Sequence, residues 1–366
     1  MSSKILTHIA GTFLVEASAS FLNGAGLGDG ENRNVTLPKT FRDGRDRVPY
    51  VSSQAWRRWL RNTLIEETNW PASVLRPLDL SEKGTTNKIG GEFDPINYPE
   101  DDIFGYMRAE AKQKPRIDVE DSENDATDVV KEKGQPVKPV IRASPFSTSI
   151  LCSIRKSGWQ GRDEGFVHLK EGTPLPYTTE FYNTHLEGIF SLNYMRLGVF
   201  WNIGDRVELD EAKTCKLLTD GKIKIVKEEK SGKVYEVTDV AVKRKERASA
   251  VLNALAHLRG GAKQAAFGTD VAPKALILAG VSCGNPMLNS LFVDDGSGPC
   301  LKIDTLKEIA KDYADRIVTP IFIGIRKGYL KNESDVLQLQ NVVDIGVTFK
   351  VLTPIESAQE MAMVLT

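Results

Sequence analysis

A long stretch near the N-terminus alternates between apolar and polar side chains. From Ile5 to Phe21, most odd positions are apolar, while Thr12, Glu16 and Ser18 lie between them. Successive side chains of a strand point to opposite faces of a sheet, with a period of two. The pattern therefore predicts a long first strand with one buried face. A polar, glycine-rich loop, NGAGLGDGENRN, follows it.

Residues 48–67, VPYVSSQAWRRWLRNTLIEE, have the period of an amphipathic helix. Ser52 or Ser53 can cap its start, because a serine hydroxyl accepts from the free amides of the first turn. The apolar positions fall on one face: Trp56, Trp59, Leu60 and Leu64. The two tryptophans are therefore expected to be core residues. Three arginines remain for the solvent side, where we expect them to be available to a ligand: Arg57, Arg58 and Arg61.

Residues 71–140 interrupt this regular patterning with prolines, glycines and acidic residues around one apolar island, DDIFGYM. We interpret them as an insertion, part helix and part loop. Strand-like alternation resumes at 144–154 and at 186–200. Residues 203–242 contain turn signals between basic, β-rich runs, which predicts hairpins. ERASAVLNALAHLRGG then predicts a second helix that ends at its glycines, and KALILAGV predicts a buried strand.

With the insertions removed, the order is strand, helix, strand, strand, helix, strand. This is the order of ferredoxin-like and RRM-like domains, in which two helices cover one face of a four-stranded sheet. We therefore predict an α+β fold of this type. The other face of the sheet is expected to be open to a ligand. The patterned segments 304–316, 319–325 and 346–352 are expected to extend this core.

Composition narrows the class of protein. The 366 residues are 41% hydrophobic and 27% charged, as in a globular protein with a sizeable core. Apolar runs are far shorter than the ~20 residues that span a bilayer, and the N-terminus resembles no export signal, so we expect a cytoplasmic protein with no membrane contact. The four cysteines are scattered, which argues against a zinc site or disulfides. We expect no cofactor and no metal.

The net charge is only −1, but the charges are unevenly distributed. Residues 39–61 hold seven basic and two acidic side chains, and residues 222–247 hold nine basic and five acidic ones. Much acid is gathered in DVEDSENDATD, residues 118–128, with six carboxylates. Such an acidic run is usually solvated, whereas clustered arginines favour a polyanionic partner.

The loop RGGAKQ, residues 259–264, joins the second predicted helix to the last strand of the predicted core. Its consecutive glycines can cap the helix and allow a tight turn. They can also bring the main chain close to a ligand and present amides to an anion, with charge added by Arg259 and Lys263. A P-loop is excluded, because the motif lacks its first glycine and the Ser or Thr after the lysine.

Several of these segments, in this order, resemble the CRISPR-associated Cas seven family, within it the DevR-type autoregulator branch of type I-B systems. They are VSSQAWRRWLR with Asn23 and Lys39 before it, then DIFGYM, RASPFSTS, TEFYNTHLEGIFSL and LRGGAKQAAFGTDVAPK. The resemblance implies a non-enzymatic backbone subunit. Many copies of it polymerise along a CRISPR RNA in a Cascade interference complex, contacting other Cascade subunits and supporting guide pairing with target DNA.

The resemblance also implies a hand-like architecture. Its RRM-like palm comprises residues 1–70, 141–202 and 243–366. The helical finger insertion corresponds to 71–140, which we expect to be partly disordered, and the β-hairpin thumb corresponds to the basic region 203–242. In the family, the thumb reaches over the neighbouring copy.

The residues expected to contact RNA combine the matched motifs with the basic cluster. They are Asn23, Lys39, Arg42, Ser52, Ser53, Gln54, Arg57, Arg58, Arg61, Arg259, Gly260, Gly261, Lys263 and Gln264. A subunit that holds any guide sequence must grip phosphates and sugars rather than base edges. The sheet lacks the aromatic signature of base-stacking RRM domains, which agrees with this mode.

Two other functions stay open. A metal-independent RNA endonuclease would use His8 or His185 as its acid or base, although no partner is evident near either in sequence. A DNA-binding autoregulator is the function that the branch name suggests. We expect the four histidines to be structural: His8, His168, His185 and His257.

Overall fold

The computed structural model describes most of the chain. The described residues are 4–28, 34–74, 76–80, 86–108, 139–167 and 169–365. The acidic run at 118–128, much of the predicted insertion, and His168 lie outside these ranges. No helix within them is long and apolar enough to cross a membrane.

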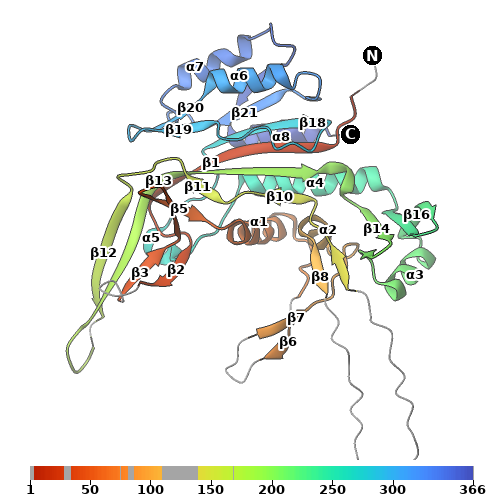
Figure 1. The fold of residues 1–366 in the computed structure, drawn as a ribbon, viewed down its shortest axis with the longest axis horizontal. Helices are drawn as coiled ribbons and strands as arrows, with labels where there is room; N and C mark the ends of the chain where they lie inside the picture. The colour runs from red at the N-terminus through yellow and green to blue at the C-terminus, as the bar shows by residue number, and fades with distance from the viewer. Residues whose placement is uncertain are drawn as a thin grey trace, which may run out of the picture.

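The largest sheet has a ferredoxin-like core (Figure 1). β1 (His8–Ser20) lies between β13 (Leu175–Asn193) and β18 (Ala275–Val281). On its other side β13 pairs with β10 (Phe146–Thr148) and β11 (Leu151–Ser153). All four pairings are antiparallel, as in the split βαβ pattern of ferredoxin-like domains. The predicted α+β class and RRM-like topology are confirmed.

Three helices cover one face of this sheet: α1 (Ser53–Thr68), α4 (Val240–Ala256) and α8 (Pro354–Met363). Trp56 of α1 is fully buried, edge-on to Phe13 of β1 with ring centroids 5.3 Å apart. Its indole nitrogen donates to the backbone oxygen of Ser149 at 2.7 Å. Because a large buried apolar side chain contributes about 1.5–3 kcal/mol, these contacts fix α1 on the sheet. Trp56 is a core residue, as predicted.

The opposite face is partly covered, which corrects the expectation of an open face. The C-terminal helices α6 (Ile303–Asp312) and α7 (Glu333–Gln338) share an apolar cluster with β1, β18 and β21 (Ile321–Ile325). The sequence carried a sign of this, because the uninterrupted apolar run of β18 is typical of a strand buried on both faces. β21 and β22 (Phe349–Leu352) extend the sheet, as predicted.

A second sheet lies beside the first and contains the predicted basic hairpin. Its strands are, in order, β16 (Ile223–Glu229), β17 (Gly232–Val237), β14 (Val199–Ile203), β15 (Arg206–Val207), β9 (Val140–Arg142) and β8 (Tyr106–Arg108). β14 and β15 form a second, short antiparallel hairpin, but the hairpin expected at the DG signal is wrong, because residues Glu211–Thr219 form α3. Asp210 caps this helix by accepting from the amide of Lys213. The DG turn at 220–221 ends α3 rather than closing a hairpin.

Short elements complete the described chain: β2 (Gly24–Leu27), β3 (Val35–Pro38), β4 (Thr40–Asp43), β5 (Asp46–Val51), β6 (Arg76–Leu80), β7 (Thr86–Gly90), α2 (Pro99–Phe104), η2 (Tyr194–Arg196), α5 (Gln264–Phe267), β19 (Phe292–Asp294), β20 (Pro299–Leu301) and η3 (Leu339–Asn341). β3 pairs in parallel with β13, and β5 pairs with both β4 and β11. α2 follows β7 within the predicted insertion and packs next to α1.

β12 (Gln160–Val167) and the first half of β13 form a long hairpin that extends away from the core (Figure 1). Large apolar side chains near its end are 46–63% exposed: Phe166, Val167, Leu169, Leu175 and Tyr177. We call these five residues the hairpin tip. A gathering of exposed apolar side chains is typical of a protein–protein contact.

Candidate nucleic-acid interface

Three segments that are far apart in the sequence meet at one end of the main sheet. They are the turn after β1, the start of α1 and the loop 259–264. Asn23 accepts through its side-chain oxygen from the amide of Ser52 at 3.0 Å and through its backbone oxygen from the amide of Lys39 at 2.8 Å. The amide of Ala262 donates to the backbone oxygen of Leu22 at 2.9 Å. The turn after β1 therefore contacts both the start of α1 and the glycine loop.

Both glycines of the loop are required by its geometry. Gly260 has φ 149° and Gly261 has φ 111°, in the region that side-chain-bearing residues rarely adopt. A Cβ on Gly260 would collide with the ring of Trp59, and one on Gly261 would collide with Leu22. The side-chain amide of Gln264 closes the turn by donating to the backbone oxygen of Gly260. Close packing against α1 thus explains the paired glycines without any ligand.

The two cations of the loop have different surroundings. Arg259 is exposed but pairs with Glu66 at 3.0 Å and with Glu67 at 2.8 Å, both on α1. The hydrogen bond that Arg259 donates to Glu67 raises the pKa of Arg259, and the two carboxylates compensate its charge. Lys263 is exposed and donates to the Thr179 hydroxyl at 2.7 Å, with its ammonium 5.2 Å from the ring centre of Phe21. Because these partners are uncharged, Lys263 keeps its full positive charge for a ligand.

The three arginines of α1 do not share one solvated face, contrary to the expectation. Arg57 turns inward and donates to the backbone oxygens of Phe146 at 2.9 Å and Phe104 at 3.0 Å. Arg61, one turn later, pairs with Glu100 and lies 3.6 Å from Asp101. The helical period places both on the side that faces α2, whose acidic sequence PEDDIF supplies these partners.

Arg58 lies about 100° further around the helix than Arg57 and is exposed. It makes no hydrogen bond or ion pair with any residue that the structure describes. Of the three arginines, Arg58 is therefore the one whose charge is uncompensated at the surface.

Arg57 is expected to be a structural residue. Replacing it with alanine should lower the free energy of unfolding by about 1.5–3 kcal/mol, because the partly buried oxygens of Phe146 and Phe104 would lose charged donors. Arg58→Ala should change it by less than about 0.5 kcal/mol, since the side chain is exposed. Urea denaturation of both variants measures this difference. Equal stability of the two variants would contradict the assignment.

The remaining predicted residues surround the start of α1. Ser52 is the N-cap residue, but, contrary to the expectation, its hydroxyl accepts no capping hydrogen bond. Ser53 and Gln54 begin the first turn, where free amides and the helix dipole favour an anion. Gln54 is exposed, and Lys39 is half-buried. Arg42 is exposed on β4 opposite Arg47, whose side chain is occupied by Glu180 at 2.9 Å. Contact of these residues with RNA stays a prediction.

Of the described histidines, His185 has partners that are distant in the sequence, whereas His8 and His257 bond to nearby residues. His185 hydrogen-bonds through Nδ1 to the Tyr329 hydroxyl at 2.7 Å, and its Nε2 lies 3.7 Å from Asp294. Burial lowers the pKa of His185, which favours the neutral ring at pH 7. Nδ1 of His8 bonds to the Thr7 hydroxyl, and burial lowers the pKa of His8 as well. His257 ends α4, with Nδ1 bonded to the oxygen of Asn253.

Among the described residues, no group of three or more histidines, cysteines, aspartates or glutamates is arranged to hold a metal ion. The four cysteines are present as free thiols. Asp101 is held by Arg61 and by the amide of Asp94 rather than directed to a common ligand. Burial raises the pKa of Asp101 to about 6.

Solved structures match this fold over nearly its whole length. A chain of a "CRISPR RNA-guided surveillance complex" has a TM-score of 0.51 and 12% sequence identity, with 98% of this chain and 100% of that chain covered. A chain of a "CRISPR RNA-guided surveillance complex, pre-nicking" has a TM-score of 0.50 and 11% identity, with the same coverage. No family model and no curated protein matches the sequence. The protein thus shares its α+β fold with chains of CRISPR RNA-guided surveillance complexes.

Proposed function

We propose that the protein is a non-catalytic backbone subunit of a type I-B Cascade complex, similar to the Cas seven family, and acts in the cytoplasm. In this role, copies of the chain polymerise along a CRISPR RNA, contact other Cascade subunits, and support pairing of the guide with target DNA. The observation that carries the proposal is the match in fold to chains of RNA-guided surveillance complexes over the full length of both chains.

The local chemistry of the interface supports a sequence-independent grip on RNA. Lys263 and Arg58 present charges that no described acidic residue neutralises, and Arg58 lies one turn after the exposed Gln54 on α1. These groups suit phosphate and sugar contacts, which position a strand without reading its bases. Base pairing then supplies the specificity, as in other RNA-guided effectors.

The projecting β12–β13 hairpin supports self-association. Its tip exposes five large apolar side chains on an element that stands away from the core. The basic hairpin β16–β17, in contrast, is packed into the second sheet against β14. We therefore assign the thumb role, the reach over a neighbouring copy, to β12–β13 in place of residues 203–242.

Incubation of the purified protein with a labelled guide RNA tests the proposal against its two alternatives. We expect intact RNA, protected at regular intervals in a multimeric particle, because a scaffold covers the strand without breaking it. The readouts are nuclease footprinting and light scattering. Cleavage that is lost in His8→Ala or His185→Ala would establish an endonuclease. Tighter binding to promoter duplex than to single-stranded RNA would instead establish an autoregulator.

A further inference from the structure

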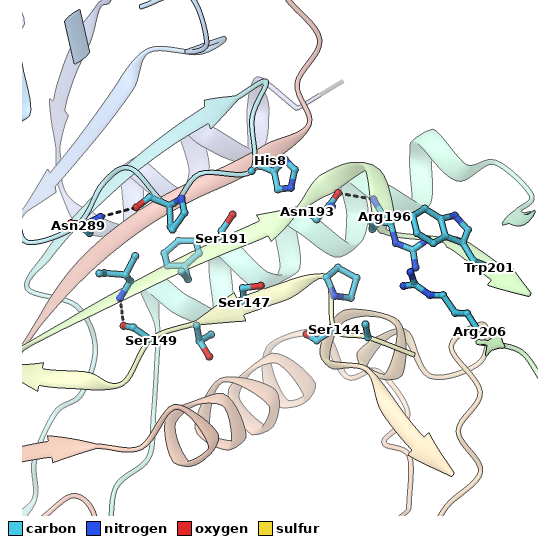
Figure 2. A pocket seen from close by; sticks show the side chains of 17 residues that line it. His8, Ser144, Ser147, Ser149, Ser191, Asn193, Arg196, Trp201, Arg206 and Asn289 are labelled. Carbon is cyan, nitrogen blue, oxygen red and sulfur yellow. Dashed lines mark hydrogen bonds between the residues drawn. The ribbon is translucent and has the colours of Figure 1, made fainter. Parts of the chain in front are cut away.

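A cavity of ≈650 Å³ opens on the sheet face over β10 and β13, beside the area that the C-terminal segment covers (Figure 2). Ser147 and Ser191 are cross-strand partners on its floor, and His8 pairs in register with Asn193 at its end. The loop that carries Asn289 forms one wall, and the second sheet forms the other. We call this cavity the sheet pocket. No residue of α1 or of the loop 259–264 lines it.

The lining of the sheet pocket is rich in hydrogen-bonding groups. Hydroxyls come from Ser144, Ser147, Thr148, Ser149 and Ser191, and amides come from Asn193 and Asn289. Pockets of about 300–1,000 Å³ with a few convergent polar groups are typical small-molecule sites. Apolar side chains such as Phe190 and Trp201 share the lining, so the pocket can take a ligand with both polar and flat apolar parts.

Positive charge is concentrated at the second-sheet end of the pocket. The guanidinium carbons of Arg196 and Arg206 lie 3.9 Å and 4.3 Å from the ring centre of Trp201 (Figure 2). Both arginines pair with one carboxylate, that of Glu208, at 2.7 Å and 2.6 Å. Glu208 also pairs with the fully buried Arg142 at 3.1 Å. One negative charge is therefore shared by three positive ones.

The buried ion pairs behind this cluster do not neutralise its excess positive charge. Asp102, also fully buried, pairs with Arg142 and with Arg247 of α4. Among the described residues, the cluster thus holds four guanidiniums and two carboxylates, an excess of two positive charges. Since uncompensated charge in a partly buried site is costly, an anion at its open end would be stabilising.

Two donors of the cluster lack a partner among the described residues, Nη1 of Arg196 and Nε of Arg247. Nη1 of Arg196 is buried and makes no hydrogen bond, although Nη2 of the same side chain binds Glu208. Arg196 lines the sheet pocket, so an acceptor placed there could satisfy this donor. A phosphate oxygen is such an acceptor, because planar guanidiniums bind phosphate with charge-assisted hydrogen bonds.

We propose that the sheet pocket binds one nucleotide, with its phosphate at Arg196 and Arg206 and its sugar or base along the serine-lined floor. The nucleotide can be free or part of a strand, since both present anionic phosphate oxygens that a guanidinium can bind. This site is additional to the proposed guide interface at α1. Only its strand-borne form rests on the proposed function.

Isothermal titration of the full chain with adenosine monophosphate, inorganic phosphate and a six-nucleotide RNA tests this site. Arg206→Gln removes one charge from a partly exposed position, and Ser147→Leu fills the floor without changing charge. Each is expected to weaken nucleotide binding about tenfold or more, Arg206→Gln by the loss of one charge-assisted contact and Ser147→Leu by filling the space of the sugar or base. Arg316→Gln, at an exposed arginine of the C-terminal segment, is the control and should change nothing.

RNA can also bind at the proposed guide interface. RNA binding to the sheet pocket is therefore measured in a chain that carries Arg58→Glu and Lys263→Glu, which removes the guide interface. If this double variant binds AMP or RNA, and Ser147→Leu weakens that binding, the site is supported. The ligand that binds shows whether the nucleotide is free or part of a strand. The proposal is overturned if neither ligand binds, if both pocket variants bind as the unchanged chain does, or if inorganic phosphate binds as tightly as AMP. Failure of the guide interface alone would leave AMP binding intact.

Discussion

Replacing Arg58 and Lys263 together with glutamate is expected to abolish assembly on guide RNA at about 150 mM salt. Both cations are exposed and neither has an acidic partner among the described residues, so each can neutralise a phosphate. Loss of two charge-assisted contacts corresponds to a decrease in affinity of about a hundredfold or more. The slope of log affinity against log salt should also fall by about 1.4, since each contact on a single strand contributes ~0.7.

The effect should be independent of RNA sequence, because phosphate contacts carry no sequence information. Filter binding with two unrelated guide sequences over a salt series measures both the affinity and the slope. Arg259→Glu should reduce RNA affinity less than the double substitution does, since Glu66 and Glu67 already compensate the charge of Arg259. An unchanged slope in the double variant would remove Arg58 and Lys263 from the interface.

Asp102→Ala is expected to lower the free energy of unfolding by about 3–5 kcal/mol, which is the largest stability effect that we predict. Asp102 is completely buried, pairs with Arg142 and Arg247, and accepts from the amide of Gly198 at 2.9 Å. Its removal would leave Arg247 without a carboxylate partner among the described residues, and Arg142 with only Glu208, which Arg196 and Arg206 also use. The cluster ties α2, α4 and the second sheet together, so their common packing should weaken.

Glu246 offers a matched control, because it directly precedes Arg247 in α4 but pairs with Lys243 at the surface. Glu246→Ala should cost less than about 0.5 kcal/mol. Chemical denaturation followed by circular dichroism compares the two variants. Similar midpoints for both would refute the structural role of the buried cluster.

The sequence predicted the main elements well where apolar periodicity was strong. The first strand was expected from Ile5 to Phe21 and is observed at His8–Ser20. The second helix was expected to begin near Glu246 but begins at Val240. Its first turns, VKRKER, contain no apolar face, and Arg247 is buried through ion pairs rather than hydrophobic contacts. A hydrophobic pattern cannot register that kind of burial.

The sequence indicated which segments form the candidate site, but not which of its arginines keep an uncompensated charge. Arg57, Arg58 and Arg61 look equivalent in the sequence, yet two of them are occupied by groups more than 35 residues away. The acidic motif at Glu100–Asp102 was the available signal, but nothing in the sequence placed it against α1. The sheet pocket was missed as well, although Ser147, Ser191 and Asn193 give two neighbouring strands a polar face.

The sequence by itself determined the α+β class and the order of the core strands and helices. These follow from local periodicity and from the few connections that such an order permits. Tertiary structure decided which cations keep an uncompensated charge, which sheet face stays accessible and which hairpin projects. Ion pairing and burial join residues that are distant along the chain, and local patterns carry no information about such partners.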